Sequence, residues 1–180
     1  MKPITKEEIA TIAKEFNLPL ASVKAVKQVE SGGKGFDKTT GKIIIQFEPS
    51  WFKRKAPFTP SGKWSLNKVE RQASEWIAFN DAFAKNPKAA MESTSWGLMQ
   101  VMGFHWKLLG FESVGAMVDF VKESEANQLR LGMMFIQTNK AMATALRNLE
   151  FGTFAYFYNG SGYKKFNYDT RLQNAYEQYT

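Results

Sequence analysis

The chain has 180 residues, of which 44% are hydrophobic and 14% aromatic, which suffices for one globular domain and excludes intrinsic disorder. It has no cysteine and a single histidine, which excludes disulfide bonds and thiolate catalysis and argues against a zinc site built from protein ligands. A net charge of +7 favours a polyanionic partner, such as nucleic acid, an anionic membrane face or an acidic cell-wall polymer.

The chain begins with a polar stretch and two predicted helices. Thr5 followed by Glu8 has the spacing of a capping box and predicts a first helix over residues 6–16. The apolar spacing that follows predicts a second helix over residues 20–31. Residues 1–8 contain no apolar segment of the length that a signal peptide or membrane span needs, so we expect synthesis in the cytoplasm.

A carboxylate lies among apolar side chains at the end of the second helix. At about 100° per residue, Glu30 falls between Val23 and Val26 on the apolar face. Desolvation at such a place raises the pKa of a carboxyl group, as a general acid requires. The alternative is a buried structural carboxylate satisfied by backbone donors or an arginine. Gly32 and Gly33 end the helix and let a ligand approach the backbone closely.

Residues 43–48 carry the one clear strand signal and predict a small β-hairpin after the turn at residues 39–41. Alternation places Ile43, Ile45 and Phe47 on one face, and Ile44, Gln46 and Glu48 on the other. The aperiodic stretch from 51 to 62 predicts a surface loop that could rim a cleft. It contains the one tight basic cluster, Lys53-Arg54-Lys55, without any nucleic-acid-binding motif.

The rest of the chain is mainly helical, with one dense stretch over residues 94–103 that mixes apolar residues with Ser95, Trp96 and Gln100. We expect Met133, Met134 and Phe135 to be core residues and His105 to be an ordinary structural or surface residue. The predicted helices cover 65–85, a short segment after Pro87, 113–122, 124–139, 140–148, 149–158 and 168–179. Without repeats or linkers, the sequence predicts one mainly α-helical α+β domain over residues 1–180.

Three stretches together resemble the signature regions of goose-type lysozymes and soluble lytic transglycosylases, in the same order. These are Glu30-Ser31-Gly32-Gly33, Ser95 to Met102, and Phe154 to Gly160. With Phe36, Phe47-Glu48 and Gly103 added, the combination most closely resembles the N-acetylmuramidase family, found as the catalytic domain of phage endolysins. The resemblance covers nearly the whole chain and implies a lysozyme-like domain with the small β-hairpin beside an active-site cleft.

Two departures from the family pattern concern architecture and position 49. Many relatives carry a separate peptidoglycan-binding module before the catalytic domain, and we expect no such cell-wall-binding module here because Met1 leads directly into the first helix. The family usually has a basic residue after the Phe-Glu pair, where this chain has Pro49. That difference removes any role borrowed for position 49 and leaves the carboxylate of Glu48 unaffected.

The resemblance implies cleavage of the β-1,4 bond between N-acetylmuramic acid and N-acetylglucosamine in peptidoglycan. Glu30 matches the family's catalytic acid, which would protonate the glycosidic oxygen. Glu48 is the best candidate for a second carboxylate, with a rim or structural role as its alternative, and Asp37 is a weaker candidate. The reaction needs no metal or organic cofactor.

The other motif residues match positions that contact the substrate in the related enzymes. Ser95 and Gln100 would bind N-acetyl and ring oxygens, and Trp96 would stack on a sugar unless it packs in the core. Tyr158 and Asn159 would approach the catalytic carboxyl and the muramyl unit; the alternative is a helix end capped by Asn-Gly, which leaves the tyrosine unexplained.

We therefore expect a monomeric endolysin that hydrolyses peptidoglycan and does not bind nucleic acid. The alternatives are a lytic transglycosylase that leaves 1,6-anhydro-muramyl products and a non-catalytic cell-wall-binding module. The family further implies release from the host cytoplasm by a holin and action in the periplasm. The positive charge would then favour approach to the anionic wall or outer membrane.

Overall fold

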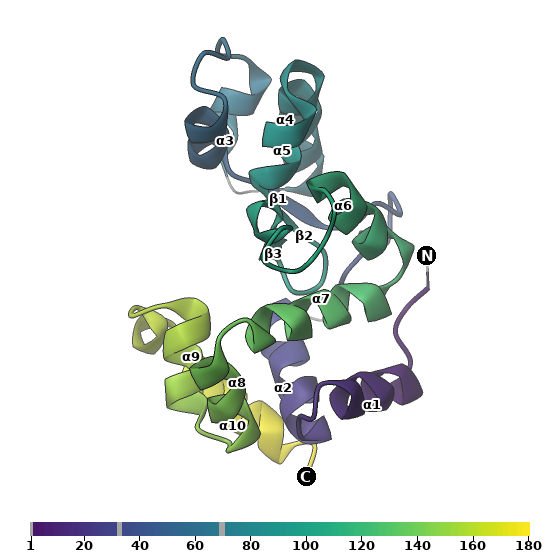
Figure 1. The fold of residues 1–180 in the computed structure, drawn as a ribbon, viewed down its shortest axis with the longest axis vertical. Helices are drawn as coiled ribbons and strands as arrows, with labels where there is room; N and C mark the ends of the chain where they lie inside the picture. Colours follow the sequence, from purple (N-terminus) through teal and green to yellow (C-terminus); the bar gives the residue numbers. More distant parts are fainter. Residues whose placement is uncertain (1, 32–33, 69–70) are drawn as a thin grey trace.

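Two lobes stand one above the other in the computed structural model, which describes residues 2–31, 34–68 and 71–180 (Figure 1). Helix α7 (Glu125–Gln137) runs between them. The glycine pair expected to end the second helix lies outside the described residues. The other helices of the lower lobe are α1 (Lys6–Glu15), α2 (Leu20–Ser31), α8 (Lys140–Arg147), α9 (Phe151–Asn159), the 3-10 helix η3 (Tyr163–Phe166) and α10 (Tyr168–Glu177).

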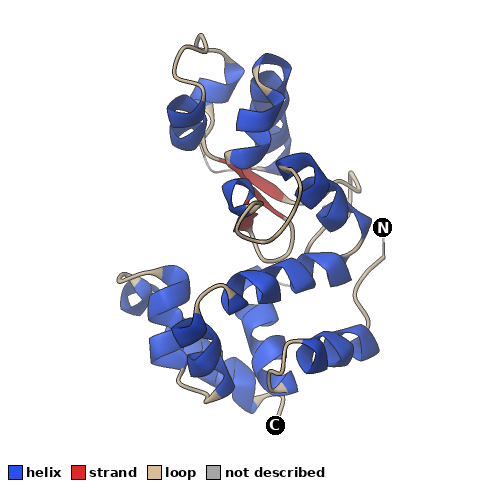
Figure 2. Cartoon of the chain, viewed as in Figure 1, coloured by secondary structure: helices blue, strands red, loops and turns tan. Residues whose placement is uncertain are grey.

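Among the described residues, the upper lobe combines four α-helices with the strands, which are red in Figure 2. Strand β1 pairs antiparallel with β2, and β2 with β3, so that Gln46 lies opposite Ser95 and Ser95 opposite Met102. The elements are β1 (Ile45–Phe47), α3 (Pro49–Lys55), η1 (Lys63–Leu66), α4 (Gln72–Lys85), α5 (Pro87–Glu92), β2 (Thr94–Trp96), β3 (Val101–Met102), η2 (Gly103–His105) and α6 (Val114–Glu123).

The expected α+β class is confirmed, and three of the predicted helices, α1, α6 and α7, begin with a capping side chain. Thr5 accepts a hydrogen bond from the Glu8 backbone while the Glu8 carboxylate accepts one from the Thr5 backbone, which completes the predicted capping box. Ser113 and Ser124, the first residues of the helices predicted over 113–122 and 124–139, cap α6 and α7. Each of these side chains satisfies a backbone N–H that the first helical turn leaves free.

The sheet is larger than the predicted hairpin because the stretch from 94 to 102 supplies two further strands. The predicted strand over residues 43–48 is shortened to Ile45–Phe47, with Ile43 in an isolated bridge to Phe36. Its alternation is confirmed, since Ile43 and Phe47 are buried whereas Gln46 and Glu48 are partly exposed. Strands of two or three residues whose partner lies 49 positions away leave little periodic signal.

The free edge of β1 is covered by side chains of α4. Gln72 accepts a hydrogen bond from the Ile45 backbone at 2.9 Å and donates one back at 2.8 Å. Glu75 accepts from the Phe47 backbone at 2.7 Å. These contacts satisfy an edge that would otherwise present unpaired backbone groups, and they attach α4 to the sheet.

Two predictions in the upper lobe are wrong in detail. The expected loop from 51 to 62 begins inside α3, where Pro49 occupies the first turn and its missing N–H leaves no hydrogen bond unmade. The helix expected over 65–85 begins only at Gln72. Residues 65 and 66 belong to η1, and residues 67 and 68 have no regular structure. The rest of the first stretch, 56–62, is irregular and includes Phe58, which is 97% exposed.

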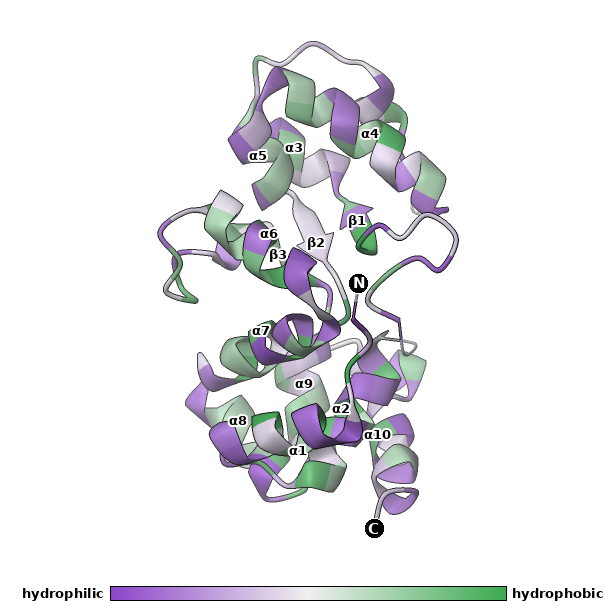
Figure 3. Cartoon of the chain, turned by 90° about the vertical axis from the view of Figure 1, so that its right-hand side faces the viewer, coloured by the Kyte–Doolittle hydropathy of each residue, from purple (hydrophilic) through white to green (hydrophobic). Residues whose placement is uncertain are grey.

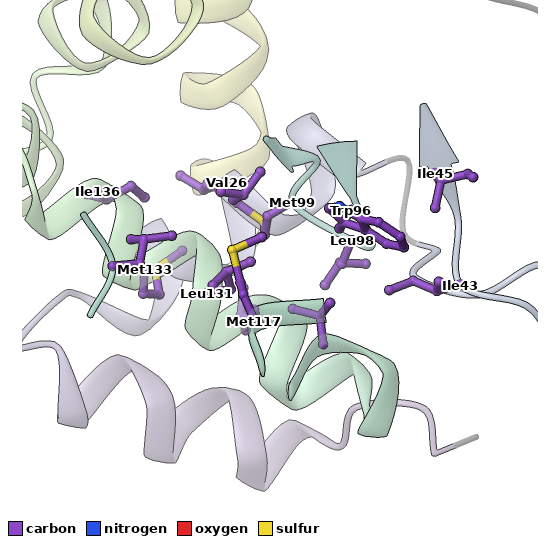
Figure 4. Packing of buried hydrophobic residues seen from close by; sticks show 14 of the residues in the cluster. Val26, Ile43, Ile45, Trp96, Leu98, Met99, Met117, Leu131, Met133 and Ile136 are labelled. Atoms are coloured by element: carbon purple, nitrogen blue, oxygen red, sulfur yellow. The ribbon is translucent and has the colours of Figure 1, made fainter. Parts of the chain in front are cut away.

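The core joins both lobes around the β2–β3 turn. In Figure 4, Met99 lies beside Val26 of α2 and residues of α7, while Trp96 lies beside Leu98 and Ile43. Hydrophilic and hydrophobic residues alternate along the helices in Figure 3, the pattern expected of helices that bury one face. Within the described ranges, no helix has the length and apolar character needed to cross a membrane.

Helix α7 fixes the two loops that lead to the site. Its Gln128 accepts a hydrogen bond from the Leu98 backbone at 2.7 Å, and its Glu125 accepts one from Gly35 at 2.9 Å. Gly97 has a φ of +67°, and a Cβ there would lie 2.6 Å from the Gln128 side chain. Glycine is therefore required at this turn for both its conformation and its close approach.

Candidate active site

A pocket of about 260 Å³ opens beside the β2–β3 turn and receives side chains from both lobes. Its size is near the lower end of ligand pockets, about 300–1,000 Å³, so it suits one part of a larger molecule. The lining residues come from α2, the β2–β3 turn, β3, η2, α7 and α9. They are Glu30, Met99, Gln100, Val101, Met102, His105, Phe135 and Tyr158.

Glu30 supplies the acid–base group of this pocket from the last turn of α2. Its Oε2 accepts one hydrogen bond, from Asn159 Nδ2 at 3.2 Å. Its Oε1 is buried without a partner among the described residues. Burial raises the pKa of Glu30 to about 6 and outweighs the Asn159 hydrogen bond and the Arg171 charge, which lower it.

Asn159 and Tyr158 reach the site from the end of α9. The sequence separates Asn159 from Glu30 by 129 positions, and the fold brings their side chains together. Tyr158 donates a hydrogen bond to the Met99 carbonyl at 3.3 Å and stacks on Phe154. Burial, and then the neighbouring Glu30 and Tyr168, raise the Tyr158 pKa far above its usual range, so the phenol keeps its proton.

Arg171 of α10 is a functional neighbour that sequence reasoning missed. Its guanidinium donates a hydrogen bond to the Val29 carbonyl at 3.1 Å, at the C-terminal turn of α2. The same guanidinium lies over the ring of Tyr168. A cation at a helix C-terminus is favourable, and this one also lowers the pKa of Glu30 slightly. No local pattern could indicate this contact, because 142 positions separate the two residues.

Ser95 and Gln100 occupy the turn between β2 and β3. Ser95 Oγ donates to Gln100 Oε1 at 2.8 Å, and Gln100 Nε2 donates to the Gly97 carbonyl at 2.8 Å. Gln100 has a φ of +49°, an uncommon conformation for a residue with a side chain. The glutamine lines the pocket, and Ser95 holds its amide in one orientation.

Trp96 does not reach the pocket. Its side chain is 1% exposed, packs edge-on against Phe79, and donates its indole N–H to the Met91 carbonyl at 3.1 Å. The predicted sugar stacking is therefore corrected to the core-packing alternative, because neither ring face is open. Trp96 lies on the inner side of a strand that is buried along its whole length.

The two other candidate carboxylates lie outside the set of residues that line this pocket. Glu48 follows β1, is half-buried, and accepts a hydrogen bond from Gln46 Nε2 at 2.6 Å. Asp37 accepts hydrogen bonds from Thr39 and Thr40, and these, led by the Thr40 backbone, lower its pKa. The Asp37 carboxylate thereby stabilises the turn over residues 37–40.

His105 and Phe135 belong to the pocket wall, although the sequence marked one as an ordinary histidine and the other as core. The His105 ring packs between Phe104 and Phe135, at centroid distances of 4.4 and 4.9 Å. Burial lowers the pKa of His105, which favours the neutral imidazole. The one sequence signal was its position two residues after Gly103, at the end of the dense stretch.

The arrangement combines a buried carboxyl group, a neutral phenol, two amides and aromatic walls at one pocket. A buried carboxyl group in these surroundings can hold a proton near neutral pH and deliver it to an oxygen of a bound molecule. Within the described residues, no cluster of three His, Cys, Asp or Glu side chains could hold a metal ion. A second hollow of about 270 Å³, over Leu66 and Ile77, is lined by lysines and has no described carboxylate.

Comparisons with known proteins concern the sequence family and the fold of the chain. The sequence model of the N-acetylmuramidase family matches residues 19–180. The crystal structure of the Burkholderia AP3 phage endolysin superposes with a TM-score of 0.88 and 35% sequence identity, over 98% of this chain and 70% of that chain. No curated protein matches.

Proposed function

The chain belongs to the N-acetylmuramidase family, and from that premise we propose that Glu30 is its general acid in peptidoglycan cleavage. The predicted resemblance to endolysin muramidases is confirmed, and the enzyme is a peptidoglycan-cleaving glycosidase with a lysozyme-like α+β fold. The bond cleaved is the β-1,4 linkage between N-acetylmuramic acid and N-acetylglucosamine.

One observation carries the assignment of Glu30. Its carboxyl group is buried at the pocket wall, has one side-chain donor, and has a pKa raised to about 6. A carboxyl group with that pKa is largely protonated in mildly acidic solution and still partly protonated near neutral pH. The position of the acid on the apolar face of α2 supports the same role, because α2 residues Val23 and Val26 are fully buried beside it.

The proposed step transfers the Glu30 proton to the glycosidic oxygen as the bond to the muramyl C1 breaks. Positive charge develops on the sugar ring, and the carboxylate left on Glu30 lies where that charge is stabilised. Asn159 keeps its hydrogen bond to Oε2 throughout and so orients the proton on the free oxygen, Oε1. Tyr158 and Gln100, which line the pocket, position the N-acetyl group and ring oxygens, and Ser95 acts with them by orienting the Gln100 amide.

Glu48 is the proposed second carboxylate, which would activate the attacking water. Inverting hydrolysis requires carboxyl groups about 6.5–9.5 Å apart, because the water lies between them. Glu48 follows the strand that pairs with Ser95, and its hydrogen bond from Gln46 fixes the carboxylate. Glu48→Gln should lower the rate of reducing-end release about a hundredfold if Glu48 is the base, and leave it within about twofold if the residue is structural.

One observation favours a lytic transglycosylase as the alternative reaction. Glu30 is the one carboxylate among the described residues that line the pocket. A transglycosylase needs no second carboxylate, because the muramyl 6-hydroxyl attacks C1 and its proton returns to Glu30. The product is a 1,6-anhydro-muramyl end, lighter by one water than the hydrolysis product.

The test compares the wild-type enzyme with Glu30→Gln on purified sacculi. Mass spectrometry of the released fragments should show reducing muramyl ends from the wild type and none from the variant. Anhydro ends from the wild type would show that the reaction is transglycosylation and not hydrolysis, and the proposed role of Glu30 would remain. A folded Glu30→Gln enzyme with wild-type release would contradict the assignment, and the melting temperature of both proteins provides the folding control.

We further propose that the enzyme acts as a monomer on the wall after holin-type release from the cytoplasm, as phage endolysins do. Its net charge of +7 supports attraction to the anionic wall or outer membrane. This attraction is a long-range effect and should weaken as ionic strength rises. Analytical ultracentrifugation tests the monomeric state, and the salt dependence of lysis rates tests the electrostatic attraction.

A further inference from the structure

A row of aromatic rings leads from the wall of the Glu30 pocket onto α3. His105 lines the pocket and contacts Phe104 at a centroid distance of 4.4 Å. Phe104 in turn contacts Trp51, in the first turns of α3, at 4.6 Å. All three rings are partly exposed. The row therefore connects the pocket to the basic cluster of α3 by direct contacts.

The row ends on Arg54, whose guanidinium lies 5.1 Å from the centre of the Trp51 ring. Arginine stacks well on aromatic faces, and stacking leaves the donors at its edge free for other partners. Arg54 is exposed and makes no ion pair with a carboxylate in the described part of the chain. The Trp51 ring therefore orients the Arg54 guanidinium, and no described carboxylate neutralises its charge.

The neighbouring lysines donate to other groups, whereas the Arg54 donors are not engaged by any described residue. Lys55 forms a salt bridge to Glu92 at 3.0 Å, and Glu92 also accepts the Trp106 indole N–H at 2.8 Å. Lys53 donates to the Pro57 carbonyl at 2.7 Å. Because the Glu92 carboxylate is already bound by Lys55 and Trp106, the surface around Arg54 keeps a net positive charge.

We propose that Arg54 binds a carboxylate of the stem peptide on the glycan strand that is being cut. Each N-acetylmuramic acid carries a short peptide on its lactyl group, and that peptide has free carboxylates. A guanidinium binds a carboxylate through two parallel hydrogen bonds. The inference rests on the proposed function, and it adds a subsite for the peptide that lies outside the pocket for the sugar.

Continuity with the pocket and charge complementarity select this ligand. A muramyl unit in or next to the Glu30 pocket would extend its peptide away from the sugar, and the ring row runs from the pocket wall to a cation. A neutral sugar would gain little from Arg54, since the guanidinium covers a face of Trp51. Arg54 is therefore a specificity residue for peptide-bearing peptidoglycan.

The experiment measures reducing-end release from intact sacculi and from sacculi stripped of stem peptides by an amidase. Arg54→Gln keeps a polar side chain and loses the charge, and Arg54→Lys keeps the charge and loses the forked pair of guanidinium donors. The matched control is Lys14→Gln, which removes an exposed charge in the last turn of α1 in the other lobe. Arg54→Gln should be about fivefold slower on intact sacculi, near the upper limit for an exposed ion pair, and less than twofold slower on stripped ones.

Arg54→Lys should recover part of the loss, and Lys14→Gln should change both rates by the same factor. Equal losses on the two substrates, or no loss on intact sacculi, would overturn the proposal. Co-sedimentation with sacculi in the inactive Glu30→Gln background provides a readout independent of cleavage. If the wild type releases neither reducing nor 1,6-anhydro ends, the proposed function fails. If it releases ends but Arg54→Gln does not distinguish the two substrates, the Arg54 subsite alone fails.

Discussion

Two buried glutamates, one in each lobe, have opposite surroundings. Glu75 of the upper lobe is 2% exposed, and its Oε2 accepts from the Phe47 backbone at 2.7 Å and from Asn67 at 3.0 Å. Glu30 of the lower lobe has one side-chain donor and faces a pocket. Burial alone does not separate the two, because Oε1 of each is buried without a partner among the described residues. The donors and the pocket separate them: Glu75 accepts a backbone hydrogen bond at the sheet edge, whereas Glu30 faces the pocket in which, under the proposed function, it delivers its proton.

The first prediction sets the chemistry of the two glutamates against each other. Glu30→Gln should lower the rate of peptidoglycan cleavage about a thousandfold, because a general acid contributes about 10²- to 10⁴-fold. Glu75→Gln should keep the rate within about threefold, since an amide oxygen can still accept from Phe47. Initial rates of reducing-end release measure both, and comparable losses in the two variants would abolish the contrast.

The second prediction concerns stability, where Glu75 is the residue expected to have the large effect. Glu75→Ala leaves the Phe47 backbone donor and one Asn67 donor without their acceptor, so it should lower the free energy of unfolding by about 3 kcal/mol. Glu112→Ala, at an exposed position, should change it by less than about 0.5 kcal/mol. Urea unfolding provides the measurement. A loss at position 75 no larger than in this control would show that the edge of β1 does not need Glu75.

The third prediction uses the pH dependence of stability. The folded pKa of Glu30 is about 6, above its ordinary value of 4.5, so the folded state binds this proton more tightly than the unfolded chain. Burial of Glu30 therefore destabilises the protein increasingly as pH rises from 4.5 through 6. Glu30→Gln should stabilise it by up to about 2 kcal/mol at pH 8 and by almost nothing at pH 4. A gain that does not depend on pH would contradict the assigned cause.

The smallest expected effect comes from Asn159. Its amide lowers the pKa of Glu30, so Asn159→Ala should move the alkaline limb of kcat/KM to higher pH. The loss of one neutral hydrogen bond should also reduce kcat/KM at pH 5 about three- to tenfold. A pH profile of the variant measures both quantities. A limb that stays in place or moves to lower pH would mean that this hydrogen bond does not influence the acid.

The helices, the capping box and the candidate acid could be predicted because their signals are local. Glu30 stands out within one helix, since the seven residues before it suffice to define the apolar face that Val23 and Val26 share with it. Thr5 and Glu8 define a helix start within four positions. The strand alternation from Ile43 to Phe47 is local too, and its buried face is where the pattern placed it.

Features that depend on distant contacts could not be predicted. Trp96 is a core residue because Phe79 and the sheet enclose it, which no local pattern shows. His105 lines the pocket because η2 follows β3 at that point, and Glu75 is structural because the edge of β1 lies against α4. In each case the partner lies on another element, so the role follows from tertiary packing. The family resemblance supplied the order of the motifs, and the hydrogen bond from Asn159 to Glu30 joins the first motif to the third.

The most direct test of the central claim is a carboxyl-carbon NMR titration of Glu30, assigned by the signal that disappears in Glu30→Gln. We predict a pKa of about 6, produced by burial against the opposing effects of Asn159 and Arg171. A titration midpoint near the ordinary value of 4.5 would contradict the account, because burial would then not raise the pKa and Glu30 would keep almost no proton near neutral pH.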